Sequence, residues 1–315
     1  MSDCGHRWAK PRVILVATDL NDLERLMPYA IEQASEAGAR LILLHVLASS
    51  AAMSVDAAGM PYYDTTGVVE SVEKQLLAWS ERAQLEGVLC EAVVREGNPT
   101  NQIATVIRQF KVNRVLLGTR SRSKIGKLLI GSVAEQVLRS ANIPVITVGP
   151  EAHLPVDSGR RDRVVLYATS LRETSRPSAA LACSIAANLS ARLVLLHVLP
   201  PADEMMRDGL MTGLDSLAMH ELRKLAAETG AGCCSAVEPV VVHGNPVIEI
   251  LSESVERHAS LIVLGATQRS AFENMARDRI IYRVLAHARC PVLTLREPLE
   301  ELAEVAAERM AIEQP

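Results

Sequence analysis

Short runs rich in Val, Ile and Leu recur along the chain. They include RVILVATDL from Arg12, RLILLHVL from Arg40 and VLLGT from Val115. None of these runs alternates apolar with polar residues, which is typical of strands buried on both faces of a parallel sheet. The pattern therefore predicts parallel strands at the centre of the fold.

The segments between these runs carry apolar residues at spacings of three and four, which predicts helices with one buried face. Residues 22–37 show the pattern well, and Gly38 is placed to end that helix. The same periodicity predicts helices over 174–189, 68–86 and 215–229. The apolar positions of the first helix are Leu23, Leu26, Met27, Ala30, Ile31 and Ala34.

The second half of the chain repeats the first half in the same order. Five pairs match: RVILVATDL with RVVLYATSL, RLILLHVL with RLVLLHVLP, EGNP with HGNP, VLLGT with IVLGA, and IPVITV with CPVLTL. Five collinear matches do not arise by chance, so the chain is two diverged copies of one unit. In the GNP motif Asn98 suits an N-cap and Pro99 the first helical position, so a third helix is expected to begin there in both copies.

Five strands alternating with four helices in each copy predict an α/β protein of two tandem doubly wound, Rossmann-like domains. Each is expected to be a five-stranded parallel sheet with helices on both faces. We place the first domain at 1–150, a Pro-, Gly- and charge-rich linker at 151–162, and the second domain at 163–297. Apolar residues on one face predict a C-terminal amphipathic helix over 298–315.

Charge and hydropathy limit the classes of partner that the chain is expected to bind. The chain has 33 basic and 37 acidic residues, so no overall basic field favours nucleic acid or an anionic membrane. The apolar runs stop far short of the roughly 20 residues that span a bilayer, and the N-terminus lacks the apolar core of a signal peptide. We expect a cytoplasmic protein without membrane insertion.

The six cysteines show no CxxC spacing, so no metal site is expected. Reduced thiols are the expected state. Cys183 and Cys290 lie in apolar runs and are expected to be small buried side chains. A disulfide between the neighbours Cys233 and Cys234 would be strained, so it is not expected.

A candidate anion site lies where strands end. In an open parallel sheet the ligand crevice lies at the carboxyl ends of strands, where the winding reverses. The fourth strand ends at Gly118 and runs into TRSRSKIGKLLIGS, after which a helix is expected to start near Ser132. Small residues let backbone amides approach an anion, and the helix start adds free N–H groups. The loop also carries Arg120, Arg122, Lys124 and Lys127.

These residues resemble the ATP-binding type of the universal stress protein family. Its signature is Gly, two residues, Gly, nine residues, then Gly-Ser or Gly-Thr. Here Gly118, Ser121 and Gly131-Ser132 stand at those positions, together with VATD after the first strand and LLHV in the second. The resemblance covers residues 10–150 and 161–297, as in a tandem member. It implies an adenine nucleotide alpha hydrolase-like fold in each half.

The resemblance also implies the roles of particular residues toward ATP or another adenine nucleotide, with or without Mg²⁺. Ala17, Thr18 and Asp19 would line the adenosine, and Val46 would offer its backbone to adenine. The residues around ribose and phosphates would be Leu117, Gly118, Arg120, Ser121, Gly131, Ser132 and Val133. Ser121 departs from the signature because its Cβ stands where close backbone approach is needed, although its hydroxyl is a donor.

The second copy departs at each decisive position. Asp19 becomes Ser170, Ser121 becomes Gln268, and Gly131-Ser132 becomes Asp278-Arg279. An Asp at the helix start would repel a phosphate placed there. We therefore expect a nucleotide site in the first domain alone and a degenerate second domain.

No catalytic residues are expected. His45 has a counterpart, His197, in the copy without a site, which favours strand-end histidines satisfied by backbone. The segment TDLNDLER also lacks the SGGxDS loop of the pyrophosphatase-type relatives. The expected function is a stress-response regulator, at most a slow ATPase, that binds ATP in its first domain and signals by conformation or by association with an unidentified protein partner. The alternative is an interaction scaffold or apolar small-ligand binder that acts through the second domain.

The last strand of each copy is a candidate pairing surface. Single-domain members of the family pair through these strands, which implies that VITV from Val145 and VLTL from Val292 form an intramolecular pseudo-dimer. A homodimer of the whole chain is also expected.

Overall fold

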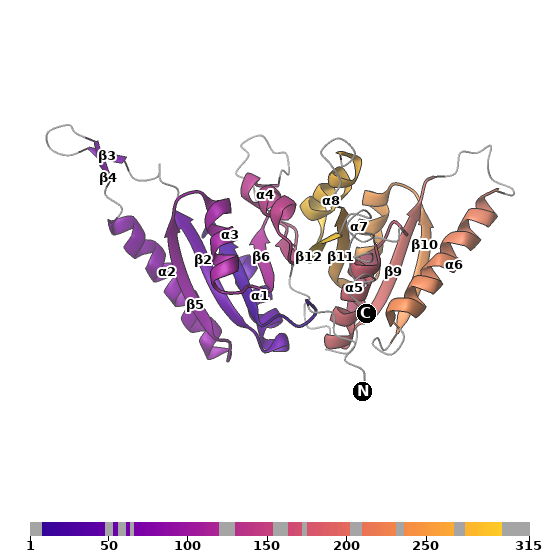
Figure 1. Ribbon diagram of the computed structural model, residues 1–315, viewed down its shortest axis with the longest axis horizontal. Coiled ribbons are helices and arrows are strands. Elements are labelled where there is room, and N and C mark those ends of the chain that lie inside the picture. Colours follow the sequence, from indigo (N-terminus) through magenta and orange to yellow (C-terminus); the bar gives the residue numbers. More distant parts are fainter. Residues whose placement is uncertain are drawn as a thin grey trace, which may run out of the picture. The chain divides into compact units, whose positions relative to one another are not determined.

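The chain forms two compact units in the computed structural model (Figure 1). The first domain is Lys10–Leu154, and the second is Pro155–Pro315 together with Met1–Ala9. The structure describes residues 8–47, 53–55, 61–63, 66–119, 130–153, 163–171, 175–201, 210–230, 236–267 and 275–297. The predicted C-terminal helix over 298–315 lies outside this part, as does most of the predicted linker.

Strands alternate with helices in the first domain. In chain order its elements are β1 (Val13–Thr18), α1 (Leu23–Ala37), β2 (Arg40–Leu47), β3 (Met53–Val55), β4 (Pro61–Tyr63), α2 (Thr66–Leu85), β5 (Cys90–Glu96), α3 (Pro99–Gln109), β6 (Arg114–Gly118), α4 (Ser132–Ser140) and β7 (Val145–Val148). The short strands β3 and β4 pair as an antiparallel hairpin between β2 and α2, which the sequence pattern does not predict.

The second domain repeats this order without the hairpin in its described part. Its elements are β8 (Val164–Ala168), α5 (Arg176–Asn188), β9 (Arg192–Leu199), α6 (Leu210–Gly230), β10 (Val237–His243), α7 (Pro246–Glu256), β11 (Ala259–Thr267), α8 (Met275–His287) and β12 (Val292–Glu297). The α/β class and the Rossmann-like repeat are thereby confirmed, with helix ends within a few residues of those predicted.

Each domain has one five-stranded sheet in which every neighbouring pair is parallel. The order is β5-β2-β1-β6-β7 in the first domain and β10-β9-β8-β11-β12 in the second. The first strand of each domain therefore lies between the second and the fourth. The winding direction reverses beside β1 and beside β8, which is where a crevice forms in such sheets.

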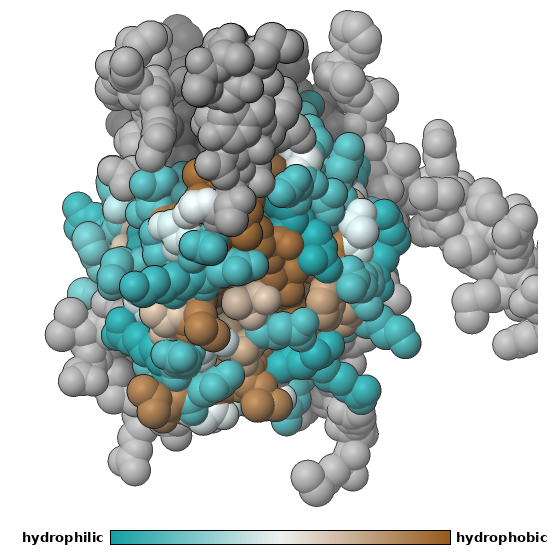
Figure 2. Space-filling view, turned by 90° about the vertical axis from the view of Figure 1, so that its left-hand side faces the viewer, coloured by the Kyte–Doolittle hydropathy of each residue, from teal (hydrophilic) through white to brown (hydrophobic). Residues whose placement is uncertain are grey.

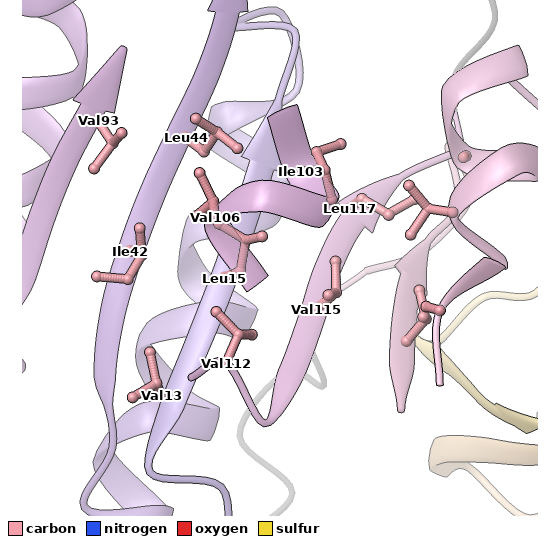
Figure 3. Packing of buried hydrophobic residues seen from close by; sticks show 14 residues of the cluster. Val13, Leu15, Ile42, Leu44, Val93, Ile103, Val106, Val112, Val115 and Leu117 are labelled. Atoms are coloured by element: carbon pink, nitrogen blue, oxygen red, sulfur yellow. The ribbon is translucent and has the colours of Figure 1, made fainter. Parts of the chain in front are cut away.

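The strands of the first domain are buried on both faces. On one face, alternate residues such as Leu15, Ile42 and Val115 pack with Ile103 and Val106 of α3 (Figure 3). On the other, Ile14, Val16 and Leu43 are fully buried. Both faces exclude water, so the strand sequences carry apolar residues without alternation.

Local signals set the helix ends as the sequence predicts. Gly38 caps α1 with a positive φ of 64°, a conformation that costs glycine little. The Asn98 side chain accepts from Asn101 N at the start of α3, and the Asn245 side chain accepts from Val247 N at the start of α7. The GNP motif thus has the same structural role in both domains.

Helix α2 buries a narrow stripe and leaves most of its surface in solvent. Val72, Leu76 and Ala83 are buried at helical spacing. The side of the molecule that carries α2 is largely hydrophilic, with apolar side chains between the polar ones (Figure 2). Among the described residues of this domain, the exposed large apolar side chains are Val68, Leu77, Leu85 and Leu89.

The prediction for Cys290 is confirmed, and the prediction for Cys183 is wrong in part. Cys290 is free and buried, and burial raises its thiol pKa to about 12, as expected of an unreactive side chain. Cys183 is also buried, but it is disulfide-bonded, so its predicted reduced state is wrong. An apolar run indicates burial, whereas a disulfide depends on a second sulfur brought near by the tertiary fold.

No helix in the described ranges is long and apolar enough to cross a membrane.

Candidate functional site

A cavity of about 320 Å³ opens at the carboxyl ends of β1, β2 and β6 in the first domain. Strand register assembles it: Thr18 pairs with His45, and Ala17 pairs with both Leu44 and Leu117. Nine sequence-predicted site residues line this single cavity: Ala17, Thr18, Asp19, Val46, Leu117, Gly118, Gly131, Ser132 and Val133. The other two, Arg120 and Ser121, lie outside the described residues.

The turn after β1 holds Asp19 at the rim of the cavity. Asn21 N donates to Asp19 Oδ1 at 3.0 Å, and Leu20 N donates to Thr18 Oγ1 at 2.9 Å. Asp19 is exposed, and the bond from Asn21 leaves the second carboxylate oxygen as an acceptor. The position suits the hydrogen bond to ribose or base that the sequence predicts.

Asp22 is a lining residue that the sequence analysis missed. It is 7% exposed, and its Oδ1 accepts from the Thr18 hydroxyl at 2.6 Å. Burial raises the carboxyl pKa above its ordinary value, and the Thr18 hydrogen bond opposes that rise. Asp22 is the N-cap of α1, but its side chain makes no capping bond. An Asp at the start of a helix has an adequate local role as a cap, so local sequence signals do not indicate that Asp22 lines a cavity.

Residue 118 has to be glycine because the Asp22 side chain lies where a Cβ would be. A Cβ at residue 118 would overlap Asp22 Oδ2 and lie 3.2 Å from Arg25 Nη2. The first glycine of the signature therefore makes room for a buried carboxylate beside the cavity. A side chain here would displace Asp22 and with it the hydroxyl of Thr18.

His45 is held by backbone, as predicted. Its Nδ1 lies 2.9 Å from Thr18 O, and His197 Nδ1 lies 2.9 Å from Thr169 O in the second domain. A carbonyl oxygen only accepts, so Nδ1 carries a proton in both rings, and Nε2 is an acceptor when the ring is neutral. The equal geometry in both copies favours a structural role for this ring nitrogen.

The start of α4 lines one side of the cavity. Gly131 is the N-cap with extended backbone, and no side chain caps the helix. The N–H groups of Ser132, Val133 and Ala134 belong to the first turn, which has no partners within the helix. Glu135 in that turn is paired with Arg139 at 2.9 Å. Free amides and the positive end of the helix dipole suit a phosphate.

Apolar residues from three elements close the other side. Leu44 from β2, Leu117 from β6 and Ile103 from α3 lie together at the upper end of the core in Figure 3. All three line the cavity, as do Pro99 and Ala134. Leu117 was among the predicted site residues, whereas Leu44, Ile103 and Ala134 were not, because helical and strand periodicity cannot tell which end of a core is open.

The second domain differs from the first at the start of its fourth helix. Its fourth helix was expected to start at Asp278-Arg279, the counterparts of Gly131-Ser132, but α8 begins at Met275, about one turn earlier. Met275, Ala276 and Arg277 are good helix formers and no glycine interrupts them, which explains the early start. The backbone N–H groups at positions 279–281 therefore lie within a helix that already engages them.

Among the described residues, no three His, Cys, Asp or Glu side chains are grouped to hold a metal ion. Fold and cavity together define a tandem doubly wound α/β protein with a ligand crevice in its first half. The universal stress protein family model matches residues 11–149 and 163–296. The chain belongs to the universal stress protein family, as a tandem member.

Individual relatives agree with this assignment. A universal stress protein of Mycolicibacterium smegmatis is 25% identical over 304 residues, covering 90% of this chain and 96% of the relative. One from Methanocaldococcus jannaschii is 27% identical over 136 residues, covering 43% of this chain and 80% of the relative. The crystal structure of a universal stress protein from Archaeoglobus fulgidus has a TM-score of 0.69 at 20% identity, covering 92% and 97% of the two chains.

Proposed function

We propose that the first domain binds ATP or another adenine nucleotide and that the protein acts as a stress-response regulator. The observation that carries this proposal is the cavity itself. Residues from three distant segments meet there, and they supply an acidic acceptor, apolar walls and an uncapped helix start. These are the three chemistries that a nucleoside phosphate needs.

Size and polarity support a nucleotide. The cavity of about 320 Å³ is at the lower end of the range of about 300–1,000 Å³ for small-molecule sites. Leu44, Ile103 and Leu117 would contact the base, with the Val46 backbone beside them. Asp19 would accept from ribose or base, and the amides at 132–134 would donate to phosphate.

We propose regulation rather than turnover. Among the described residues that line the cavity, the groups that could act as a base are Asp19, Asp22 and His45. Asp22 is bound to Thr18, and His45 to a backbone carbonyl. The hydroxyl paired with one of these groups is that of Thr18, which is 9% exposed and donates to Asp22 at the end of β1. Bound nucleotide would instead bias the conformation of the first domain or its association with a protein partner.

Gly131→Asp tests the proposal without harming the fold. Aspartate is a favourable N-cap, so α4 should be retained or stabilised, while the carboxylate repels a phosphate at the same amides. Calorimetric titration of the wild type should give at most one ATP per chain, and Gly131→Asp should abolish binding with an unchanged circular dichroism spectrum.

Two control variants separate charge from capping. Gly131→Asn adds an N-cap side chain without charge and should weaken binding less than Gly131→Asp. Asn245→Asp adds the same charge at a helix start of the second domain and should leave ATP binding intact. Absence of binding at millimolar ATP would refute the proposal, and two sites per chain would refute the assignment to one domain.

A further inference from the structure

The second domain keeps a cavity at the position of the first-domain site. It measures about 180 Å³ and lies at the carboxyl ends of β8, β9 and β11 beside the starts of α5 and α7. Thr169, His197 and Gly265 line it at the positions of Thr18, His45 and Gly118. The second domain therefore has a crevice at the same place in the fold, although its fourth helix does not begin at the position of Gly131-Ser132.

Larger side chains account for the smaller volume. Ile280 and Ile281 of α8 line the cavity at the positions that Val133 and Ala134 hold in α4. Each isoleucine adds methyl or methylene groups on the side where phosphates would lie. The remaining walls are also largely apolar, with Leu196, Val198, Pro246, Ile250 and Leu264.

The described lining holds no Asp, Glu, Lys or Arg side chain. Burial of an ionised group without a partner is strongly unfavourable, so the cavity selects against charged ligands. Ser170 replaces the acidic Asp19 at the end of the first strand. The described lining therefore favours a neutral occupant.

Most polar groups in the cavity already have partners. The Tyr167 hydroxyl donates to Ser175 O at 2.9 Å, and Thr169 Oγ1 accepts from Leu171 N at 3.0 Å. His197 Nδ1 donates to Thr169 O, which leaves Nε2 as an acceptor with no hydrogen bond in the described structure. The cavity thus combines largely apolar walls with the hydroxyl-bearing residues Ser170 and Ser175 and with His197, whose Nε2 can accept a hydrogen bond from a ligand.

We propose that the second domain binds a neutral aromatic molecule of one or two fused rings that carries a single N–H or O–H donor for His197 Nε2. A dry apolar cavity of about 150 Å³ holds a benzene ring, so about 180 Å³ suits this size class. This site is separate from the nucleotide site, and it stands whether or not the first domain binds ATP.

Calorimetric titration of the full chain with indole tests the proposal. One indole should bind per chain, and saturating ATP should not displace it. Benzofuran has the same shape without the N–H, so it should bind roughly three- to tenfold more weakly. His197→Phe should remove the difference between the two ligands.

Filling and enlarging variants locate the site. Val198→Trp should abolish indole binding, whereas the matched Val46→Trp in the first domain should leave it unchanged. The double variant I280V/I281A carries the side chains of the first domain and should shift preference from indole toward the larger 2-naphthol. Absence of indole binding at millimolar concentration, or binding lost in Val46→Trp and kept in Val198→Trp, would overturn the proposal.

Discussion

At the scale of single residues, the cavity of the first domain depends on a contact between a buried acid and a glycine. Asp22 lies against Gly118, and the Thr18 hydroxyl holds it there. The contact joins the ends of β1 and β6, the two strands beside which the winding reverses. A substitution at either residue should therefore displace the other residue and change the shape of the cavity.

Gly118→Ala should weaken both folding and ligand binding. The added Cβ overlaps Asp22 Oδ2, and overpacking of this kind costs about 1–3 kcal/mol. Urea unfolding should show that loss, and ATP titration should show weakened binding. Gly213→Ala is the control, because a Cβ there meets nothing within 4 Å and alanine in a helix gains up to about 1 kcal/mol. Equal effects of the two variants would contradict the assigned contact.

Asp22→Asn should change how stability depends on pH. The pKa of Asp22 is raised in the folded state, so protonated Asp22 favours folding. This contribution to the free energy of unfolding is fully present below the pKa of the unfolded carboxyl, and it is lost as pH rises through the pKa of the folded state. Asparagine cannot ionise and can still accept from Thr18. The variant should therefore gain free energy of unfolding over the wild type between about pH 4 and pH 7.

Urea unfolding across that range measures the difference. Asp19→Asn is the matched control, since Asp19 is an exposed carboxylate in the same turn. A stability advantage of Asp22→Asn that shrinks toward neutral pH would contradict the assignment.

At the scale of elements, helix starts separate what folding needs from what a ligand needs. The third helix begins at the same GNP motif in both domains, with Asn98 and Asn245 as caps. The fourth helix begins with an uncapped glycine in one domain and about a turn earlier in the other. The structure shared by the copies supports the fold, and the differing helix start is where the proposed ligand sites of the two domains differ.

Asn98→Ala and Asn245→Ala should therefore cost similar stability. Loss of an N-cap costs about 1 kcal/mol, and each asparagine makes the same kind of bond to backbone N–H groups. Chemical unfolding of each variant measures this cost. ATP affinity should be unchanged in Asn245→Ala. A cost confined to one of the two caps would show that the repeated motif is not structurally equivalent.

At the scale of the whole molecule, two domains with separate cores share one chain. If the first domain alone binds ATP, the ligand should stabilise that domain and leave the other unchanged. Stabilisation is about 2.7 kcal/mol at a ligand concentration one hundred times Kd. Scanning calorimetry should show one transition that moves upward with ATP. A shift of the whole profile by an equal amount would show that the domains unfold as one unit.

Pairing of the copies through their last strands, homodimerisation and a cytoplasmic location stay predictions.

Much of the candidate site was predictable because its residues follow sequence signals that depend on neighbours along the chain. Gly131-Ser132 before a helix and Thr18-Asp19 after a strand are such signals, and the repeat showed where they persist. Asp22, Pro99 and Ile103 were missed because a cap, a helix start and a core position each have an adequate local explanation. Only the spatial arrangement shows that they also line a cavity.

The sequence by itself determined the α/β class, the duplication, the helix signals of GNP and Gly38, and the residues by which the two halves differ at the predicted site. These properties follow from periodicity and local backbone preference, which act over a few residues. The tertiary structure decided that Asp22 lies against Gly118, that Cys183 is disulfide-bonded, and that the second domain keeps a cavity whose described lining is largely apolar. Each depends on atoms brought together from distant segments, which no local pattern encodes.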